Sequence, residues 1–336
     1  MEPPLCKTRG LFSKKNLKEE EKVGKYVLKR FGAALLSLFI IITLIFCLLR
    51  LMPLEGYLGP NVDKLSEEVI HAKLAAKGLD KPVPVQLFNF YRNLARGDLG
   101  KSWIYRENVD IVKIIKPKVK ISAKLGAIAM GLSLLVGIPL GATMARCKGK
   151  WPDKLGTGFI IFLQAAPSAV YFLFIQMYAT KGTGLPMLYN DSKPISWILP
   201  IVSLALPSIA NYGMWMRRYM VDQMNQDYVK LARAKGVSNK AVMMKHVFRN
   251  AFVPMVQTIP SSLLFTIMGS LYVESIYSVP GMGGLLIDVI QRQDNTMVQA
   301  LVLIFASVGI IGLFLGDILM VLVDPRINLT GKEESR

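Results

Sequence analysis

Residues 31–49 read FGAALLSLFIIITLIFCLL, a run of nineteen positions without Lys, Arg, Asp or Glu. A charged side chain at the centre of a bilayer costs several kcal/mol, so a charge-free run of this length is typical of a membrane-spanning helix. As a helix it is long enough to cross about 30 Å of hydrocarbon. It is too long for the apolar core of a signal peptide and lacks a small-residue cleavage site, so we expect a retained anchor.

Five further charge-free intervals of similar length follow. The composition agrees with them: 52% of the residues are hydrophobic and 19% are charged, whereas soluble domains have about 25% charged residues. We therefore predict an all-α integral membrane protein with six transmembrane helices. The five later spans are expected at residues 125–145, 155–180, 194–216, 250–273 and 295–316, the last continuing to 323.

Basic residues gather before the first predicted span, after the second and after the fourth. Because basic loops stay on the cytoplasmic side, this pattern predicts that both termini are cytoplasmic. The net charge of +18 then belongs to membrane-flanking loops, and we expect no nucleic-acid partner. The resulting organisation is a basic cytoplasmic tail (1–25), a six-helix domain (26–326) with a long extracytoplasmic first loop (53–120), and a cytoplasmic tail (327–336).

The cytoplasmic loop at 217–250 is too regular for a simple linker. Met224, Tyr228 and Leu231 recur at i, i+4 and i+7, which predicts an amphipathic helix over 222–235. A patterned segment of this length below the membrane is expected to have a role of its own.

Gly236 stands where a C-terminal glycine would end that helix, and Ser238 could cap the next one. The sequence thus predicts a cytoplasmic helix-turn-helix knob. Small residues at its turn favour close approach by a protein partner, and the alternative is a basic helix lying on membrane lipid. The second helix is expected to bury one stripe made of Val237, Ala241, Met244, Phe248 and Ala251.

Residues 227–238, DYVKLARAKGVS, closely resemble the coupling-loop signature (EAA motif) of permeases from binding-protein-dependent ABC importers. The resemblance is strongest to the peptide/nickel branch, and within it to the B-type oligopeptide permease subunits. It covers about residues 26–326, although Lys230 and Leu231 replace the Glu and Ala of the broad signature. Similar segments are KHVFRNAFVP (245–254), GDLG (97–100), APS (166–168), VESIYSVPGMG (273–283) and DPR (324–326).

This resemblance implies a permease subunit that forms half of an oligopeptide pathway across a bacterial cytoplasmic membrane. It implies four partners: a second, paralogous permease, two ABC ATPases and an extracytoplasmic substrate-binding protein. ATP and Mg would be used by the ATPases, with no cofactor bound by this chain. The residues implied to couple to the ATPases are Asp227, Tyr228, Ala232, Arg233, Ala234, Lys235, Gly236, Val237 and Ser238.

Other functions remain as alternatives. A dipeptide or nickel importer is the nearest of them, because selectivity largely resides in the binding protein. An ATP-independent secondary transporter or channel is more remote, since the spans are nearly free of ionisable residues. A membrane enzyme is not expected: the sequence has no metal-ligand spacing and no nucleophile elbow.

The stretch ARGDLGKS at 95–102 resembles a permissive phosphate loop. A true phosphate loop follows a buried strand, whereas residues 86–94 read as a short amphipathic helix. We therefore do not expect nucleotide binding there.

Polar side chains inside the predicted spans could line a pathway or form hydrogen bonds between helices. Asp317, near the cytoplasmic end of the last span, is expected to pair with a basic residue. The candidates for the pathway are Gln164, Asn211, Gln257 and Ser261.

Overall fold

A computed structural model describes residues 8–52, 55–58 and 64–323, and the predicted tail at 327–336 lies outside them. In this part of the chain the regular elements are helices, with one isolated bridge between Lys101 and Asp110. Five helical stretches are long and apolar enough to cross a membrane, or six with one bent pair, so the predicted all-helical membrane fold is confirmed. The five are Val27–Arg50, Ile111–Arg146, Pro194–Met224, Asn239–Ile276 and Asn295–Met320.

Two of these helices extend well beyond the charge-free intervals. Helix α1 is Thr8–Arg50 and helix α5 is Ile111–Arg146. Charged side chains mark where a helix leaves the hydrocarbon, and they do not end the helix itself. The remaining spanning elements are η3 (Pro194–Trp197) with α9 (Ile198–Met224), α12 (Arg249–Ile267) and α15 (Asn295–Val323).

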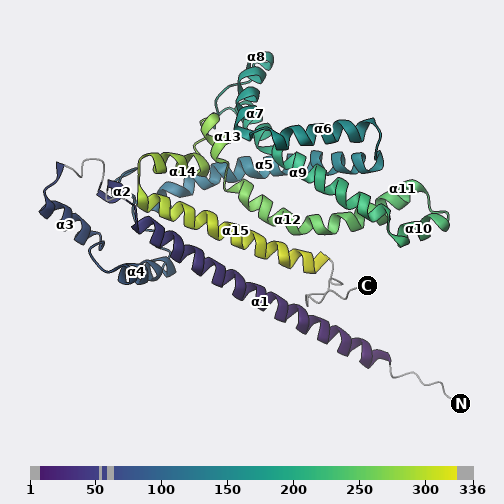
Figure 1. The fold of residues 1–336 in the computed structure, drawn as a ribbon, viewed down its shortest axis with the longest axis horizontal. Coiled ribbons are helices and arrows are strands. Elements are labelled where there is room, and N and C mark those ends of the chain that lie inside the picture. The colour runs from purple at the N-terminus through teal and green to yellow at the C-terminus, as the bar shows by residue number, and fades with distance from the viewer. Residues whose placement is uncertain (1–7, 53–54, 59–63, 324–336) are drawn as a thin grey trace.

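The third predicted span, 155–180, is wrong as a single straight helix. Helix α6 (Trp151–Ala165) and the helical stretch that follows it are bent by 107°. The cause is Pro167, which has no N–H and holds Ala166 in an extended conformation with ψ 136°. Figure 1 shows the second part leaving the bundle steeply. It consists of α7 (Ser168–Phe174), η2 (Ile175–Ala179) and α8 (Thr180–Thr183).

The fifth predicted span, 250–273, is also interrupted. Helix α12 ends at Ile267, and Gly269 has φ +94°, which a β-carbon would make unfavourable. Ser270 then caps a new short helix, accepting a hydrogen bond from the Val273 N–H. Helices α13 (Leu271–Ile276) and α14 (Met282–Gln291) lead into α15.

Helices α5 and α9 pack closely along their length. Gly137 and Gly141 form a G-x-x-x-G pair on α5, the spacing that lets two helix backbones approach. A β-carbon on Gly137 would lie 2.9 Å from the Ile209 carbonyl oxygen, and one on Gly141 would overlap the Gly213 carbonyl oxygen. Only glycine fits at either position without separating the helices.

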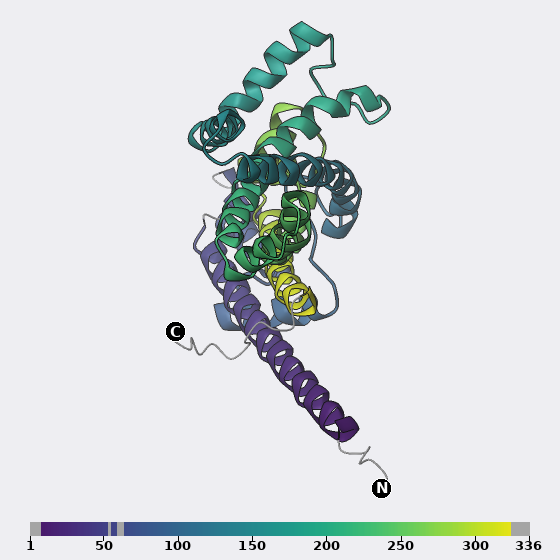
Figure 2. The same cartoon turned by 90° about the vertical axis from the view of Figure 1, so that its right-hand side faces the viewer.

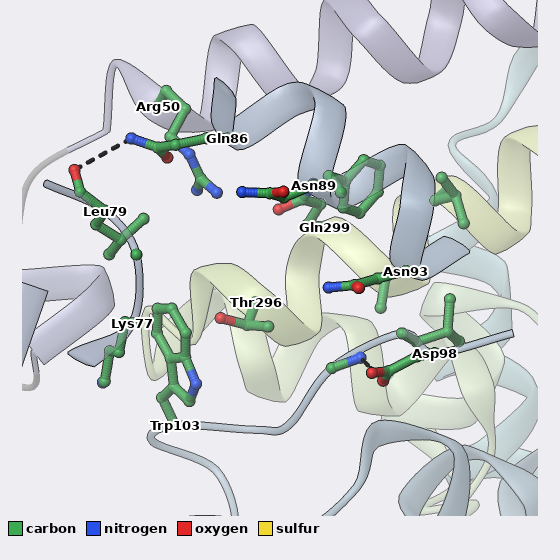
Figure 3. Close-up of a pocket in the computed structure, with 16 residues that line it drawn as sticks. Arg50, Lys77, Leu79, Gln86, Asn89, Asn93, Asp98, Trp103, Thr296 and Gln299 are labelled. Carbon is green, nitrogen blue, oxygen red and sulfur yellow. Dashed lines mark hydrogen bonds between the residues drawn. The ribbon is translucent and has the colours of Figure 1, made fainter. Parts of the chain in front are cut away.

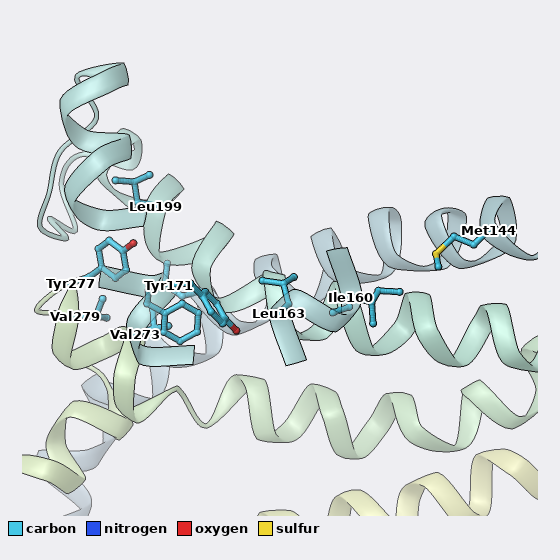
Figure 4. Close-up of a cluster of buried hydrophobic side chains, with 11 residues drawn as sticks. Met144, Ile160, Leu163, Tyr171, Leu199, Val273, Tyr277 and Val279 are labelled. Atoms are coloured by element: carbon cyan, nitrogen blue, oxygen red, sulfur yellow. The ribbon is translucent and has the colours of Figure 1, made fainter. Parts of the chain in front are cut away.

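A buried cluster joins α6, α7, α9 and α13 at the bend (Figure 4). Tyr277 is fully buried there, and its hydroxyl lies 2.8 Å from the Ser203 hydroxyl on α9. The bend after α6 is therefore held by tertiary packing. The side chains labelled in the cluster are Met144, Ile160, Leu163, Tyr171, Leu199, Val273, Tyr277 and Val279.

Helix α1 lies at one edge of the bundle beside α15, and its first part extends past the other helices (Figures 1 and 2). Phe31 packs against Phe314, and Arg30 Nη1 lies 3.2 Å from an Asp317 carboxylate oxygen. The predicted pairing of Asp317 with a basic residue is confirmed.

Between α1 and α5 the described residues form three short helices. The predicted helix at 86–94 is confirmed within α4, so ARGDLGKS follows a helix and lacks the strand of a phosphate loop. The three are α2 (Glu55–Leu58), α3 (Glu67–Ala76) and α4 (Val83–Ala95).

Candidate functional site

The knob, residues 227–248, lies at the end of the bundle where α9 ends and α12 begins (Figure 1). The predicted helix at 222–235 is wrong at its start, because α9 runs on to Met224 and a new helix begins at Asp227. Gln226, between them, has extended backbone angles that periodicity alone does not reveal. The knob consists of α10 (Asp227–Ala234), α11 (Asn239–Ala241) and the π-helix η4 (Val242–Phe248).

The turn between α10 and α11 is fixed by backbone hydrogen bonds. Gly236 has φ +75° and its N–H donates to the Arg233 carbonyl, while the Val237 N–H donates to the Ala232 carbonyl. This pair of bonds is a Schellman motif, which requires a left-handed residue at the glycine position. The Ser238 hydroxyl accepts from the Ala241 N–H at 3.4 Å, so both the glycine stop and the serine cap are confirmed.

The predicted apolar stripe on the second helix is correct only in part: Ala251 is buried, and Phe248 is half-buried and packs on the same cluster. Val237 and Met244 are exposed, whereas Val242 and Val247 are fully buried. Both valines lie in a π-helix, whose turns are wider than those of an α-helix. A pattern drawn for 3.6 residues per turn therefore misses these two valines.

The inner side of the knob is packed on the spans. Val229 and Ala232 of α10 join Val242 and Val247 in a cluster that includes Met216 on α9. Close-packed apolar contacts of this kind transmit displacement because they have little free volume. A force on the knob would therefore reach α9 directly.

The outer side of the knob combines apolar and basic side chains. Leu231 and Met244 are each 56% exposed, and Val237 is also exposed. Lys230 donates to an Asp227 carboxylate oxygen at 2.8 Å, and this hydrogen bond holds the pKa of Asp227 below its usual range. Exposed basic residues surround these side chains: Lys230, Arg233, Lys235, Lys240 and Lys245.

This outer face suits a protein partner with an apolar centre and acidic edges. Of the nine coupling residues implied by the sequence, Ala232 is buried and Tyr228 is half-buried. The other seven are exposed on the knob: Asp227, Arg233, Ala234, Lys235, Gly236, Val237 and Ser238.

Sequence reasoning missed an ion pair that ties α6 to α9 near the knob. Arg217 donates through Nε and Nη2 to the two carboxylate oxygens of Asp153, which also accepts from the Gly149 N–H at 2.9 Å. Asp153 is buried. The signal in the sequence was one acidic residue inside an otherwise basic loop, close to the start of a span.

At the opposite end of the bundle, Glu274 is buried in a cradle of glycines. Its carboxylate accepts from the Ser122 hydroxyl at 2.6 Å and from the Gly284 N–H at 2.9 Å. A β-carbon on Gly281 would overlap both the carboxylate and the Ser122 hydroxyl. This explains Gly281 of the 273–283 motif, whereas a β-carbon on Gly283 would lie 2.8 Å from the Leu271 nitrogen.

The four candidate pathway residues do not meet in one place. Gln164 on α6 and Asn211 on α9 are exposed, and Gln164 Nε2 lies 3.5 Å from Met214 Sδ. On α12, Gln257 donates to an Asp317 carboxylate oxygen at 3.1 Å, and Ser261 lies against Gly312 of α15. Two candidates therefore face α15, and two lie on a surface that this chain leaves open.

Within the residues that the structure describes, no group of three or more His, Cys, Asp or Glu side chains could hold a metal ion. The site thus consists of a bundle of spanning helices and a helical knob with one face exposed.

Comparison with known proteins defines the family. The family described as "Binding-protein-dependent transport system inner membrane component" matches residues 137–329, more than half of the chain, and the chain belongs to it. It is accordingly a multi-pass inner membrane transport subunit and not an enzyme.

Named relatives are peptide and glutathione permeases. The chain is 41% identical over 218 residues to the oligopeptide transport system permease protein AmiC of Streptococcus pneumoniae, which is 63% of this chain but only 43% of AmiC. It is 32% identical over 306 residues to the dipeptide transport system permease protein DppB of Lactococcus lactis, covering 91% of this chain and 99% of DppB. It is 30% identical to the glutathione transport system permease protein GsiC of Escherichia coli K12, covering 90% of this chain and 98% of GsiC.

Proposed function

We propose that this chain is a B-type permease subunit of an ATP-driven oligopeptide importer in a bacterial cytoplasmic membrane, with both termini cytoplasmic. One chain contributes half of the translocation pathway, and a second, paralogous permease contributes the other half. The family match supports a permease subunit, and the relationship to AmiC supports an oligopeptide substrate. The B-type assignment follows from the motifs in the sequence. The observation that carries it is the knob, whose outer face is exposed while its inner face is packed into the bundle.

In this mechanism two partner ATPases bind ATP and Mg and dock on the outer face of the knob. Their closure displaces the knob, and the buried cluster that Val229 and Val247 share with Met216 passes the displacement to α9. The pathway then changes the side to which it is open. An extracytoplasmic binding protein delivers the peptide at the opposite end of the bundle.

The substrate is tested by uptake into vesicles that contain this chain, its paralogous permease, both ATPases and the binding protein. We expect ATP-dependent uptake of a labelled pentapeptide that neither excess dipeptide nor nickel inhibits. Inhibition by dipeptide would favour the activity named for DppB, and inhibition by nickel would indicate a nickel importer. Uptake without ATP or partners would contradict the importer itself.

We further propose that Gln164, Asn211, Gln257 and Ser261 line the pathway. Aqueous reagents are expected to reach the exposed residues Gln164 and Asn211 before the other two. In a variant without native cysteines, Cys at 164 or 211 is expected to react with a charged aqueous thiol reagent during turnover. Cys at 257 or 261 should react more slowly, because both positions face α15.

Two positions serve as controls for this labelling. The controls are Ser203→Cys and Leu135→Cys. Ser203 lies on the same helix as Asn211 but is fully buried, and Leu135 is 76% exposed on an apolar surface. The pathway assignment fails if Asn211→Cys reacts no faster than these two controls.

A further inference from the structure

A cavity of about 190 Å³ lies at the end of the bundle away from the knob (Figure 3). It is formed where the end of α1, helix α4 and the start of α15 meet. Two cationic side chains line it, Arg50 from α1 and Lys77 from the segment after α3. Its other polar lining consists of Gln86, Asn89, Asn93, Asp98, Thr296 and Gln299.

The walls of this cavity are fixed by interactions around Asp294. One carboxylate oxygen of Asp294 accepts from the Ser102 hydroxyl at 2.7 Å and from the Trp103 N–H at 3.2 Å. Lys77 Nζ lies 4.0 Å from the centre of the Trp103 ring and donates to the Tyr57 carbonyl at 2.7 Å. The cavity walls are therefore held in place by contacts between three separate parts of the chain.

Among the described residues, three residues that line the cavity each have a buried polar atom without a hydrogen-bond partner. The Nε2 of Gln299 and the Nε of Arg50 are donors, and the Oε1 of Gln86 is an acceptor. Gln86 is 9% exposed and Gln299 is 7% exposed, so both side chains are largely buried. Leaving a buried polar group unpaired is unfavourable, and a ligand with complementary atoms would supply the missing partners.

The three unpaired groups define the chemistry of a ligand that would fit the cavity. Two buried donors and the Arg50 charge suit an oxyanion, and the Gln86 acceptor suits a hydroxyl or amine beside it. The Asp98 carboxylate at the edge already accepts from the Gly100 N–H at 2.8 Å. Burial is the main cause that lowers the pKa of Lys77, with Lys73 adding to it, and a bound anion would offset that burial cost.

The depth of the cavity in the membrane indicates that a membrane lipid supplies this ligand. Arg50 directly follows the apolar run at 31–49 and thus lies where the hydrocarbon ends. Leu51 on α1 is 82% exposed, and Phe88 on α4 is 67% exposed, so apolar surface is available beside the cavity. Phosphate headgroups occupy this depth in a bilayer.

We propose that this cavity binds a phosphate group that carries a hydroxyl or amine close by, as in the phosphoglycerol headgroup of a phospholipid. Arg50 and Gln299 contact the phosphate, and Gln86 accepts from the neighbouring donor. A lipid or a free phosphoglycerol could supply this group, and the membrane depth favours the lipid. The proposal is independent of what the chain transports.

The test uses the complete complex in mild detergent and follows the thermal unfolding midpoint during titration. Dioctanoyl phosphatidylglycerol is expected to raise the midpoint, whereas a choline headgroup, which has no donor, should bind about tenfold more weakly. A response to glycerol phosphate equal to that of the lipid would identify a free phosphate ligand. A tripeptide that competes for the site would overturn the phosphate assignment.

Variants separate a ligand site from a structural one. Arg50→Gln is expected to weaken phosphatidylglycerol binding about tenfold, while Arg96→Gln, at an exposed position outside the cavity, should leave it unchanged.

Because Arg50 also packs on Phe46 and Tyr57, Gln299→Leu provides a second test. Removing an unpaired buried amide is expected to stabilise the lipid-free complex and to reduce the stabilisation that lipid gives. Equal lipid responses in the wild type and in both cavity variants would overturn the proposal.

Discussion

ATP-driven uptake is expected to stop when Gly236 is replaced by valine, while the subunit still inserts and assembles. Gly236 has φ +75°, a conformation that costs an L-residue about 1–2 kcal/mol. No atom of the described residues lies within 4 Å of a β-carbon built there, so the change creates no clash with them. The valine side chain instead occupies the open space in front of the turn, where we propose that an ATPase docks.

The measurement is ATP hydrolysis and peptide uptake in the same vesicles, and the chain offers a matched control. Gly149, in the turn between α5 and α6, has φ +79° and equally open surroundings among the described residues. Gly149→Val therefore carries the same backbone strain away from the knob and should retain uptake. Gly236→Asn, which tolerates the left-handed conformation, should retain partial activity. Equal uptake by the two valine variants would contradict the coupling role of the turn.

Gly141→Ala is expected to lower the stability of the bundle by about 1–3 kcal/mol, the usual effect of overpacking a filled interface. A β-carbon there would overlap the Gly213 carbonyl oxygen and lie 2.8 Å from Met216 Cβ and 3.0 Å from the Arg217 nitrogen. Two of these atoms belong to the α9 backbone, so the helices must separate to accept the methyl group. The thermal unfolding midpoint in detergent measures this loss.

Gly131→Ala is the control on the same helix. No atom lies within 4 Å of its β-carbon position, and a helical glycine is less stable than alanine by about 0.5–1 kcal/mol. This variant should be neutral or slightly stabilised. If both variants unfold at the same temperature, close approach of α5 and α9 is not what holds the bundle together.

The sequence predicted the features that depend on solvent and on local backbone chemistry. Charge-free length located the spans, and the glycine stop and serine cap of the knob follow from Gly236 and Ser238 alone. The bend after α6 was not predicted, because hydropathy runs without interruption across Pro167. Hydropathy measures the preference for lipid and contains no information about helix direction.

In the candidate site, too, local features could be predicted from the sequence and features that depend on tertiary contacts could not. The exposed knob residues could be located from a contiguous motif, whereas the Asp153–Arg217 pair joins residues far apart in the chain. The burial of Val242 and Val247 on the second helix could not be predicted, since a π-helix has no local signal that separates it from an α-helix. The pairing of Gln257 with Asp317 likewise depends on how α12 and α15 face each other.

The π-helix of the knob has a consequence for how this chain can change in evolution. A π-turn holds one more residue than an α-turn, so η4 (Val242–Phe248) contains a surplus relative to the helices on either side. A single-residue deletion elsewhere in a spanning helix rotates everything beyond it by about 100°. A deletion inside η4 can instead convert the wide turn into an ordinary one and keep α12 in register. Natural length variation in this part of the chain should therefore concentrate at η4.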